Sequence, residues 1–239
     1  MAGLFRVWRT PAPLFVIPTT SGTGSEVTIA AVVSEPSTHL KTPLIDPKLV
    51  PLMAALDANL LIDLPAKITA DTGIDALTHA IEAYISRNAT KETKAYSLAA
   101  IKLIFQYLPL AVKEGSGIEP RQKMAMASYY AGLAFTKASL GYVHAFAHSL
   151  GSKYGLPHGM ANGLALLPVL RFSLSEITPH LTAISENLEG IQGEGRPNAE
   201  SFLDKLEGLL DAIGVEQTST LLQSEDTDEL VHLLSLIHI

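Results

Sequence analysis

The chain has 239 residues, 47% apolar and 17% charged, with a formal net charge of −7 and no cysteine. Its length and apolar content suffice for one large domain or two small ones. The lack of cysteine excludes disulfides and thiolate metal sites, and the negative charge argues against nucleic acid or an anionic membrane as partner. We find no apolar run of the roughly 18–20 residues that a membrane span needs and no signal peptide, so we expect a cytoplasmic protein.

The first 65 residues have the composition of strands and loops. A short apolar run at 14–17, bounded by prolines, predicts a buried strand, and β-rich runs follow at 27–33 and 52–56. Between the first two lies a loop of small residues, 18–26, whose backbone N–H groups and hydroxyls could form a concave anion site, often one for phosphate. Taken alone, this loop is more simply a polar turn between two strands.

After residue 65 the apolar residues recur with the period of a helix. A helix starts at Pro65, and Gly190, Gly193 and Gly195 mark a loop over 187–197. Further helices are predicted at 75–85, 91–105 (ending near Pro109), 121–135, 143–150, 159–170, 201–213 (with Gly214 as its C-cap) and 224–234. The simplest fold class is an α/β piece followed by an all-α domain, which gives domains of 1–65 and 66–239.

Three of the eight histidines lie close together in a nearly uncharged segment. His144 and His148 are four residues apart, so on a helix they share one face. His158 stands between Pro157 and Gly159, where a helix start or a tight turn is expected. Any one of these histidines is more often a core or surface residue than a ligand. As a group they are candidates for a metal site, and spacing alone favours both His144 and His148 as ligands.

A second pair with the same spacing is Asp75 and His79, in an alanine-rich run with strong helical propensity. One carboxylate with several imidazoles suits a divalent first-row metal such as Fe(II) or Zn(II). A carboxylate near a helix start and one buried histidine would explain either residue alone, but not two helices that each carry such a pair. Glu82, one turn after His79, is expected on the helix surface or behind the ligands rather than in catalysis.

Three motifs in this order resemble the iron-containing (group III) alcohol dehydrogenase family: residues 18–26 (PTTSGTGSE), 72–84 (TGIDALTHAIEAY) and 141–162, which includes Pro-His-Gly. The resemblance covers about residues 5–215. It implies a dehydroquinate-synthase-like fold, with an α/β dinucleotide-binding domain, a helical metal domain and an active site between them. Residues 1–65 would then be the C-terminal portion of the first domain, and 66–239 an incomplete catalytic domain.

The resemblance also implies roles for particular residues. Asp75, His79, His144 and His158 would bind Fe(II), with Zn(II) as the alternative. His148 would then lie beside the metal, where it could relay a proton or orient the substrate. NAD or NADP would contact Thr19, Thr20, Ser21, Gly22, Thr23, Lys41 and Leu61. By itself, Lys41 is more simply a solvated surface lysine.

The sequence departs from the family pattern at both ends. The glycine-rich phosphate loop that precedes the first motif in the family is absent, and the last residues, 233–239, do not look like family sequence. His232 and His238 receive no role. We therefore expect the chain to be an internal fragment whose missing segments leave apolar faces uncovered. The whole protein is expected to form homo-oligomers and to act on a small alcohol or aldehyde. The alternatives are a maleylacetate reductase, a hydroxyacid–oxoacid transhydrogenase, or a metal-binding fragment without activity. Zinc-dependent relatives such as glycerol dehydrogenase fit less well.

Overall fold

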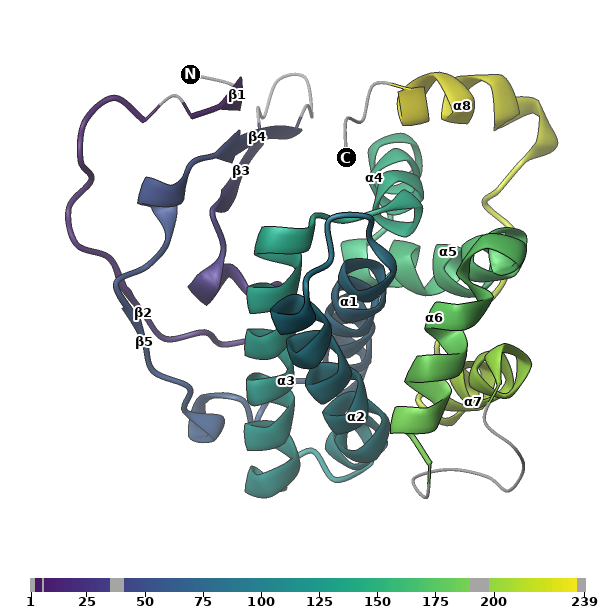
Figure 1. Ribbon diagram of the computed structural model, residues 1–239, viewed down its shortest axis with the longest axis horizontal. Helices are drawn as coiled ribbons and strands as arrows, with labels where there is room; N and C mark the ends of the chain where they lie inside the picture. Colours follow the sequence, from purple (N-terminus) through teal and green to yellow (C-terminus); the bar gives the residue numbers. More distant parts are fainter. Residues whose placement is uncertain (1–2, 6, 35–40, 190–197, 236–239) are drawn as a thin grey trace.

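The computed structural model describes residues 3–5, 7–34, 41–189 and 198–235. Helices form the main body, and the strands lie on one side of it (Figure 1). The change from strands to helices falls between residues 54 and 66, near the expected position. The predicted fold class, an α/β piece followed by a helical part, is confirmed.

The described strands form two small sheets. In the first, β1 (Gly3–Leu4) is parallel to β4 (Lys41–Ile45), and β4 is antiparallel to β3 (Ala30–Ser34). In the second, β2 (Phe15–Val16) is parallel to β5 (Met53–Ala54). Three short 3-10 helices accompany them: η1 (Ser25–Val27), η2 (Pro47–Leu49) and η3 (Ala58–Leu60).

Three predictions for this part were wrong. The strand predicted at 14–17 is not buried: Phe15 in β2 is 61% exposed, and among the described strands β2 is paired with β5 alone. The run at 27–33 begins with the end of η1, so that β3 starts only at Ala30. No strand was predicted at β4, which contains Pro43; the pairing with β3 along its whole length outweighs the local composition.

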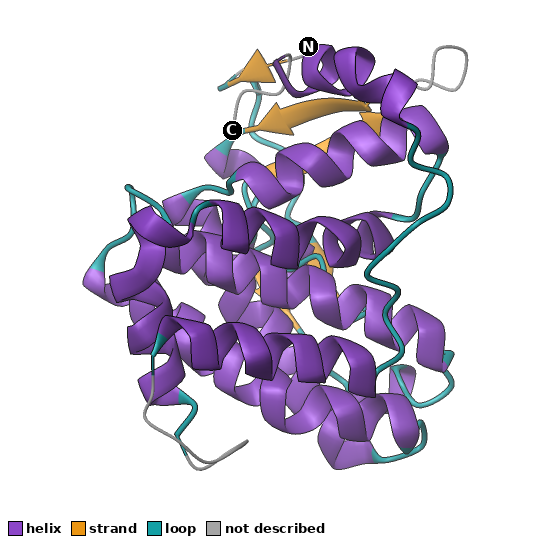
Figure 2. Ribbon diagram, turned by 90° about the vertical axis from the view of Figure 1, so that its right-hand side faces the viewer, coloured by secondary structure: helices purple, strands orange, loops and turns teal. Residues whose placement is uncertain are grey.

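Eight helices are described in the rest of the chain. They are α1 (Ala66–Ile85), α2 (Lys91–Lys113), α3 (Ile118–Ala138), α4 (Tyr142–Tyr154), α5 (His158–Phe172), α6 (Leu174–Asn187), α7 (Ala199–Ala212) and, after a 3-10 turn (Ser224–Asp226), α8 (Thr227–Ser235). Helix α1 lies in the middle and packs against α2, α3 and α5 (Figure 1). Figure 2 shows from a second side that helices make up most of the molecule. Its apolar residues Ile74, Leu77 and Ile81 are fully buried in the main core.

Packing in this core accounts for the differences from the predicted helices. Helix α2 does not end near Pro109 but continues to Lys113, because Leu108 and Ala111 on either side of the proline are fully buried. Helix α6 was not predicted, since Pro179 interrupts its pattern; Leu181 and Ile184 hold it against the core. Gly214 follows α7 with a positive φ of 69°, as a helix C-terminus requires.

By length and composition alone, α2 could also cross a membrane. This is weak evidence, because a core helix of a soluble protein meets the same criteria. Here α2 packs against α1 and α3, and its residues Ile101, Ile104 and Phe105 belong to the main core.

Candidate functional site

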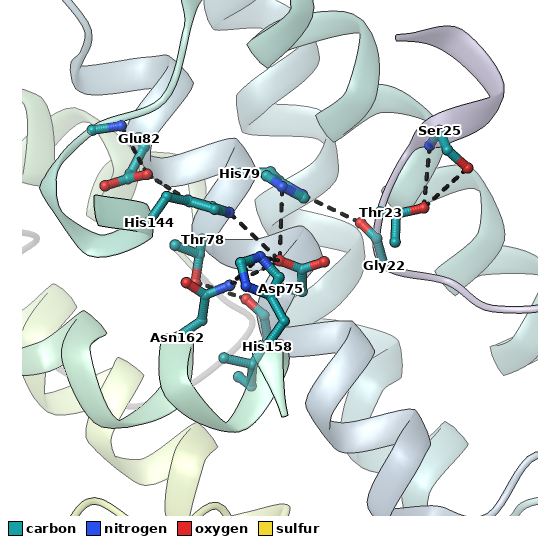
Figure 3. A network of polar contacts seen from close by, with 12 residues as sticks. Gly22, Thr23, Ser25, Asp75, Thr78, His79, Glu82, His144, His158 and Asn162 are labelled. Atoms are coloured by element: carbon teal, nitrogen blue, oxygen red, sulfur yellow. Dashed lines mark hydrogen bonds and ion pairs between the residues drawn. The ribbon is translucent and has the colours of Figure 1, made fainter. Parts of the chain in front are cut away.

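Three helices bring four predicted ligand residues to one point. Asp75 and His79 lie on successive turns of α1, His144 lies in the first turn of α4, and His158 is the first residue of α5. Figure 3 shows their side chains pointing toward one another. The Nε2 atoms of His79, His144 and His158 lie 3.7, 3.5 and 3.3 Å from Oδ1 of Asp75. Residues up to 83 positions apart in sequence therefore face one carboxylate oxygen.

The start of α5 can reach α1 because Gly159 has no side chain. A Cβ at this position would lie 2.2 Å from the backbone oxygen of Asp71. The two helices are thus in backbone contact one turn before Asp75, and this contact places His158 beside the carboxylate. Among the described residues, the side chains of Asp75, His79 and His144 also have ligand atoms within 4.8 Å of one another and are all buried.

The rings of His79 and His144 have contacts on the side that faces away from Asp75. Nδ1 of His79 faces the carbonyl oxygen of Gly22 at 3.3 Å, and its ring stacks between Phe135 and His144 at centroid distances of 4.3 and 4.5 Å. Nδ1 of His144 lies 2.6 Å from Oε2 of Glu82. A neutral imidazole whose Nδ1 donates a hydrogen bond presents the lone pair of Nε2, so in the neutral form both rings direct a lone pair at a cation bound beside Asp75.

The charges around Asp75 also suit a cation. Burial alone would raise the pKa of Asp75, but His79, His144 and His158 hold it well below its usual value. Burial lowers the pKa of His79 to about 4. Asp75 is therefore ionised and His79 neutral near pH 7, the states in which both bind metals. Burial would lower the pKa of His144 too, but the nearby carboxylates of Asp75 and Glu82 raise it to about 9. Without a metal this ring is therefore protonated near pH 7, and a bound cation would replace the proton on Nε2.

One atom in this cluster tests whether a metal ion fits. Nε2 of His144 is fully buried and has no hydrogen-bond partner among the described residues. A buried nitrogen without a partner is costly, and a bound cation would satisfy it. Nitrogen and oxygen ligands lie about 2.0–2.2 Å from a zinc ion, so atoms that share one ion lie roughly 3–4 Å apart. The three distances to Asp75 are in this range.

Asn162 also belongs to the site, although no role was predicted for it. Nδ2 of Asn162 donates a hydrogen bond to Oδ1 of Asp75 at 2.8 Å and lies 3.4 Å from Nε2 of His158. Its spacing could have indicated it, since Asn162 is four residues after His158 on one helix face. Of the two positions expected for Glu82, on the helix surface or behind the ligands, the structure shows the second: Glu82 is buried behind His144.

His148 lies beside the cluster rather than among its closest ligand atoms. It is half-buried, and its ring centroid is 5.0 Å from that of His158 and 6.5 Å from that of His144. The distances therefore do not favour the simple pairing of His144 with His148 that the spacing suggested.

The loop at 18–26 approaches the cluster from the strand side. Ser21 and Gly22 are buried, whereas Thr19 and Thr23 are exposed. A Cβ on Gly22 would lie 2.8 Å from Thr72 on α1, so the loop backbone lies directly against this helix. Thr20 is half-buried, and the hydroxyl of Thr23 accepts a hydrogen bond from the backbone N–H of Ser25. Figure 3 shows this loop running past His79.

The other two predicted cofactor residues lie farther along the chain. Lys41 is the first residue of β4 and is paired with Ser34. Leu61 follows η3 and is only 2% exposed, so almost none of its surface is open to a cofactor.

Comparison with known proteins supplies the family. Residues 3–58 match the family model "Iron-containing alcohol dehydrogenase", and residues 69–232 match "Fe-containing alcohol dehydrogenase family, C-terminal". The 1-propanol dehydrogenase PduQ of Salmonella typhimurium is 53% identical over 157 residues, 66% of this chain and 42% of the relative. The NAD-dependent methanol dehydrogenase of Bacillus methanolicus is 43% identical over 192 residues, 80% of this chain and 50% of the relative. The chain thus spans about half the length of these relatives.

Solved structures agree with this assignment. A crystal structure of 1,3-propanediol oxidoreductase superposes with a TM-score of 0.91 at 36% identity, covering 99% of this chain and 63% of the other. A maleylacetate reductase from Rhizobium sp. strain MTP-10005 gives a TM-score of 0.82 at 23% identity, over 95% of this chain and 62% of the other, a likeness of fold alone. The chain belongs to the iron-containing alcohol dehydrogenase family, as its three motifs predicted.

Proposed function

We propose that this chain is the metal-binding part of an oxidoreductase that transfers a hydride between a small alcohol or aldehyde and NAD or NADP. Residues 1–65 would be the C-terminal portion of the dinucleotide-binding domain, and residues 66–239 the helical catalytic domain. The observation that carries the proposal is the convergence of three imidazole Nε2 atoms on Oδ1 of Asp75, at 3.3–3.7 Å. Family membership then favours iron over zinc as the metal.

In this proposal the metal is held by Asp75, His79, His144 and His158. A bound divalent cation supplies Lewis acidity, which lowers the pKa of an alcohol oxygen or polarises a carbonyl. Asn162 fixes the orientation of Asp75 through its hydrogen bond to Oδ1. Gly22 and Phe135 fix the ring of His79.

The cofactor would lie along the loop at Thr19, Thr20, Ser21, Gly22 and Thr23, with further contacts near Lys41 and Leu61. Hydroxyls and backbone N–H groups in such a loop suit the diphosphate of a dinucleotide. Because the carbonyl of Gly22 already contacts His79, a cofactor on this loop would be adjacent to the metal ligands. NAD is the better supported nucleotide, since a relative that is 43% identical is named as NAD-dependent.

His148 is the proposed catalytic residue. It lies one helical turn beyond His144 and 5.0 Å, centroid to centroid, from His158. A half-buried imidazole at this place can hold or pass on a proton of the substrate hydroxyl. We also propose that the whole protein acts in the cytoplasm as a homo-oligomer, without nucleic acid or membrane partners.

The first test is metal content. We expect purified wild-type protein to contain about one equivalent of iron or zinc, and Asp75→Ala and His158→Ala to lose it. Asp71→Ala, one turn earlier on α1 where Asp71 pairs with Lys67 at the surface, is the matched carboxylate control. His180→Ala, at a histidine that packs against Tyr84 outside the cluster, is the histidine control. Unchanged metal content in both site variants would refute the proposed site.

The second test separates an oxidoreductase from a metal-binding chain without catalysis. Binding of NADH and NADPH is measured by fluorescence on the wild-type chain, followed by turnover with a panel of short alcohols and aldehydes. A 2-hydroxyacid and maleylacetate are added to the panel to test the transhydrogenase and maleylacetate reductase alternatives. Metal binding without nucleotide binding would favour the inactive alternative.

A further inference from the structure

The carboxylate of Glu82 has an unusual set of partners. Glu82 is 3% exposed, in the same helix as Asp75 and His79. Its hydrogen bonds come from the backbone N–H groups of Gly141 at 2.9 Å and Val143 at 2.6 Å and from Nδ1 of His144 at 2.6 Å. Among the described residues no lysine or arginine forms an ion pair with it. A buried carboxylate is costly unless donors surround it, and all three donors belong to the start of α4.

The contact with His144 determines how its ring is used. Oε2 of Glu82 also accepts the hydrogen bond of Gly141, so it faces Nδ1 of His144 as an acceptor. Nδ1 must therefore carry the proton, which leaves Nε2 as the atom that faces Asp75. This Nε2 is the buried atom without a hydrogen-bond partner. A carboxylate behind a histidine ligand fixes both the tautomer and the ring plane in metal sites of this kind.

The two backbone contacts act on the helix as a whole. The first N–H groups of a helix have no partner within it, and Gly141 at the N-cap of α4 has no side chain to accept one. Glu82, which belongs to α1, accepts these hydrogen bonds in place of a capping side chain. Its negative charge also lies at the positive end of the α4 dipole. Since α4 carries both His144 and His148, one side chain of α1 sets the position of both histidines.

We propose that Glu82 is a positioning residue, which fixes the start of α4 and the ring of His144 so that Nε2 is directed at the metal. This role rests on the proposed metal site, because without a metal the orientation of Nε2 serves no ligand. The competing explanation is that Glu82 only stabilises the fold. The two explanations predict different results. If Glu82 only stabilises the fold, replacing it should weaken metal binding no more than any other substitution that causes the same loss of stability.

The test compares the affinity of the metal-free full chain for Zn²⁺, measured by competition with a chelator. In Glu82→Gln an amide NH₂ must replace one of the two oxygens, so it faces either the Val143 N–H, or the Gly141 N–H and His144 Nδ1. We expect the Kd for Zn²⁺ to rise about 10- to 100-fold, the usual effect of removing such a partner. Glu82→Asp keeps the charge, but its shorter side chain moves the carboxylate away from the start of α4. It should also weaken Zn²⁺ binding, and it serves as the second variant if Glu82→Gln does not fold.

Leu206→Ala is the control for lost stability, because Leu206 is fully buried in α7, a helix that carries none of the proposed ligands. At a comparable loss of Tm it should bind Zn²⁺ within about twofold of wild type. A ¹H NMR spectrum of the Zn²⁺-loaded protein adds a direct signature. The slowly exchanging Nδ1–H of His144 should give a downfield signal in wild type and in Leu206→Ala, but not in Glu82→Gln.

The possible failures are distinct. If wild type binds Zn²⁺ and both Glu82 variants bind it equally well, the role of Glu82 is refuted while the metal site stands. If Leu206→Ala loses as much affinity as Glu82→Gln, Glu82 is merely structural. If wild type itself binds neither Zn²⁺ nor Fe(II), the proposed function fails and the role of Glu82 fails with it.

Discussion

The described strand-bearing part (residues 7–33 and 44–54) and the described helical part (residues 66–189 and 198–213) bury their apolar side chains very differently. In the first, large apolar residues such as Trp8, Phe15 and Met53 are mostly exposed. In the second, Phe105, Phe202 and their neighbours form a continuous core with almost no exposed surface. The four proposed metal ligands come from the second part alone. The comparison indicates that the ligands are positioned by a well-packed core, whereas the proposed cofactor loop depends on a few local contacts with it.

The largest expected effect is a difference in stability between a ring removed from the helical core and a ring removed from the strand-bearing part. Phe202→Ala removes a fully buried ring that packs against Phe105 and should lower the free energy of unfolding by about 3–5 kcal/mol. Phe15→Ala removes a ring that is mostly in water and should cost less than about 1 kcal/mol. Urea denaturation followed by circular dichroism measures both. Equal losses would show that the strand part has a core of its own and would remove the basis of the comparison.

A second substitution tests the link between the helical core and the segment that leads into it. Arg121 on α3 is fully buried and holds the carbonyls of Leu64 and Gly115 and the hydroxyl of Thr69. Arg121→Met would remove the guanidinium donors from these three acceptors, with an expected loss of about 3 kcal/mol in the free energy of unfolding.

The matched control is Arg171→Met. Arg171 forms an exposed ion pair with Glu207 at 2.8 Å, and its removal should cost about 0.2–1 kcal/mol. If both arginine variants lose the same stability in urea denaturation, Arg121 does not hold the start of α1 as its contacts indicate.

The same contrast explains which features the sequence could predict. Helix α7 was recognisable because its apolar residues repeat with the helical period and face the main core. The two pairs at i, i+4 spacing and the Pro-His-Gly turn indicated Asp75, His79, His144 and His158, but also His148, which only the resemblance to the family set aside. The convergence of three imidazoles on one oxygen follows from the packing of α1 against α4 and α5, which no local pattern contains.

What the sequence could not predict depends on distant partners. Helix α2 passes Pro109 because buried residues hold it in place, and β4 forms because β3 pairs with it. Glu82 could not be assigned between the helix surface and the metal site, because its three hydrogen bonds reach residues about 60 positions away. The exposure of Phe15 differs from the prediction because an apolar run indicates a strand but not what covers it.

A third prediction concerns the point where the two parts meet. In Gly22→Ala the new Cβ would lie 2.8 Å from the Cβ and the backbone oxygen of Thr72, so the loop must move away from α1 and its bond to His79 is lost. We expect the Kd for NADH, measured by fluorescence, to rise about tenfold, a free-energy change of about 1.4 kcal/mol. Gly208→Ala is the control, because a Cβ there meets no atom within 4 Å. Unchanged NADH binding in Gly22→Ala would show that the loop does not carry the cofactor.

The smallest expected effect comes from a buried charge in the loop itself. Glu26 lies in η1 with its side chain buried, and burial raises the pKa of its carboxyl above the usual value. Because the folded pKa is above the unfolded one, ionisation destabilises the fold, and stability is lost as the pH rises through the two values. Glu26→Gln should therefore be more stable than wild type at pH 8, by on the order of 1 kcal/mol, and equal to it at pH 4, where Glu26 is largely protonated. Urea denaturation at both pH values measures the difference; a loss of stability at pH 8 would mean that the ionised carboxylate has a stabilising partner, and that the strand part is better held than the comparison implies.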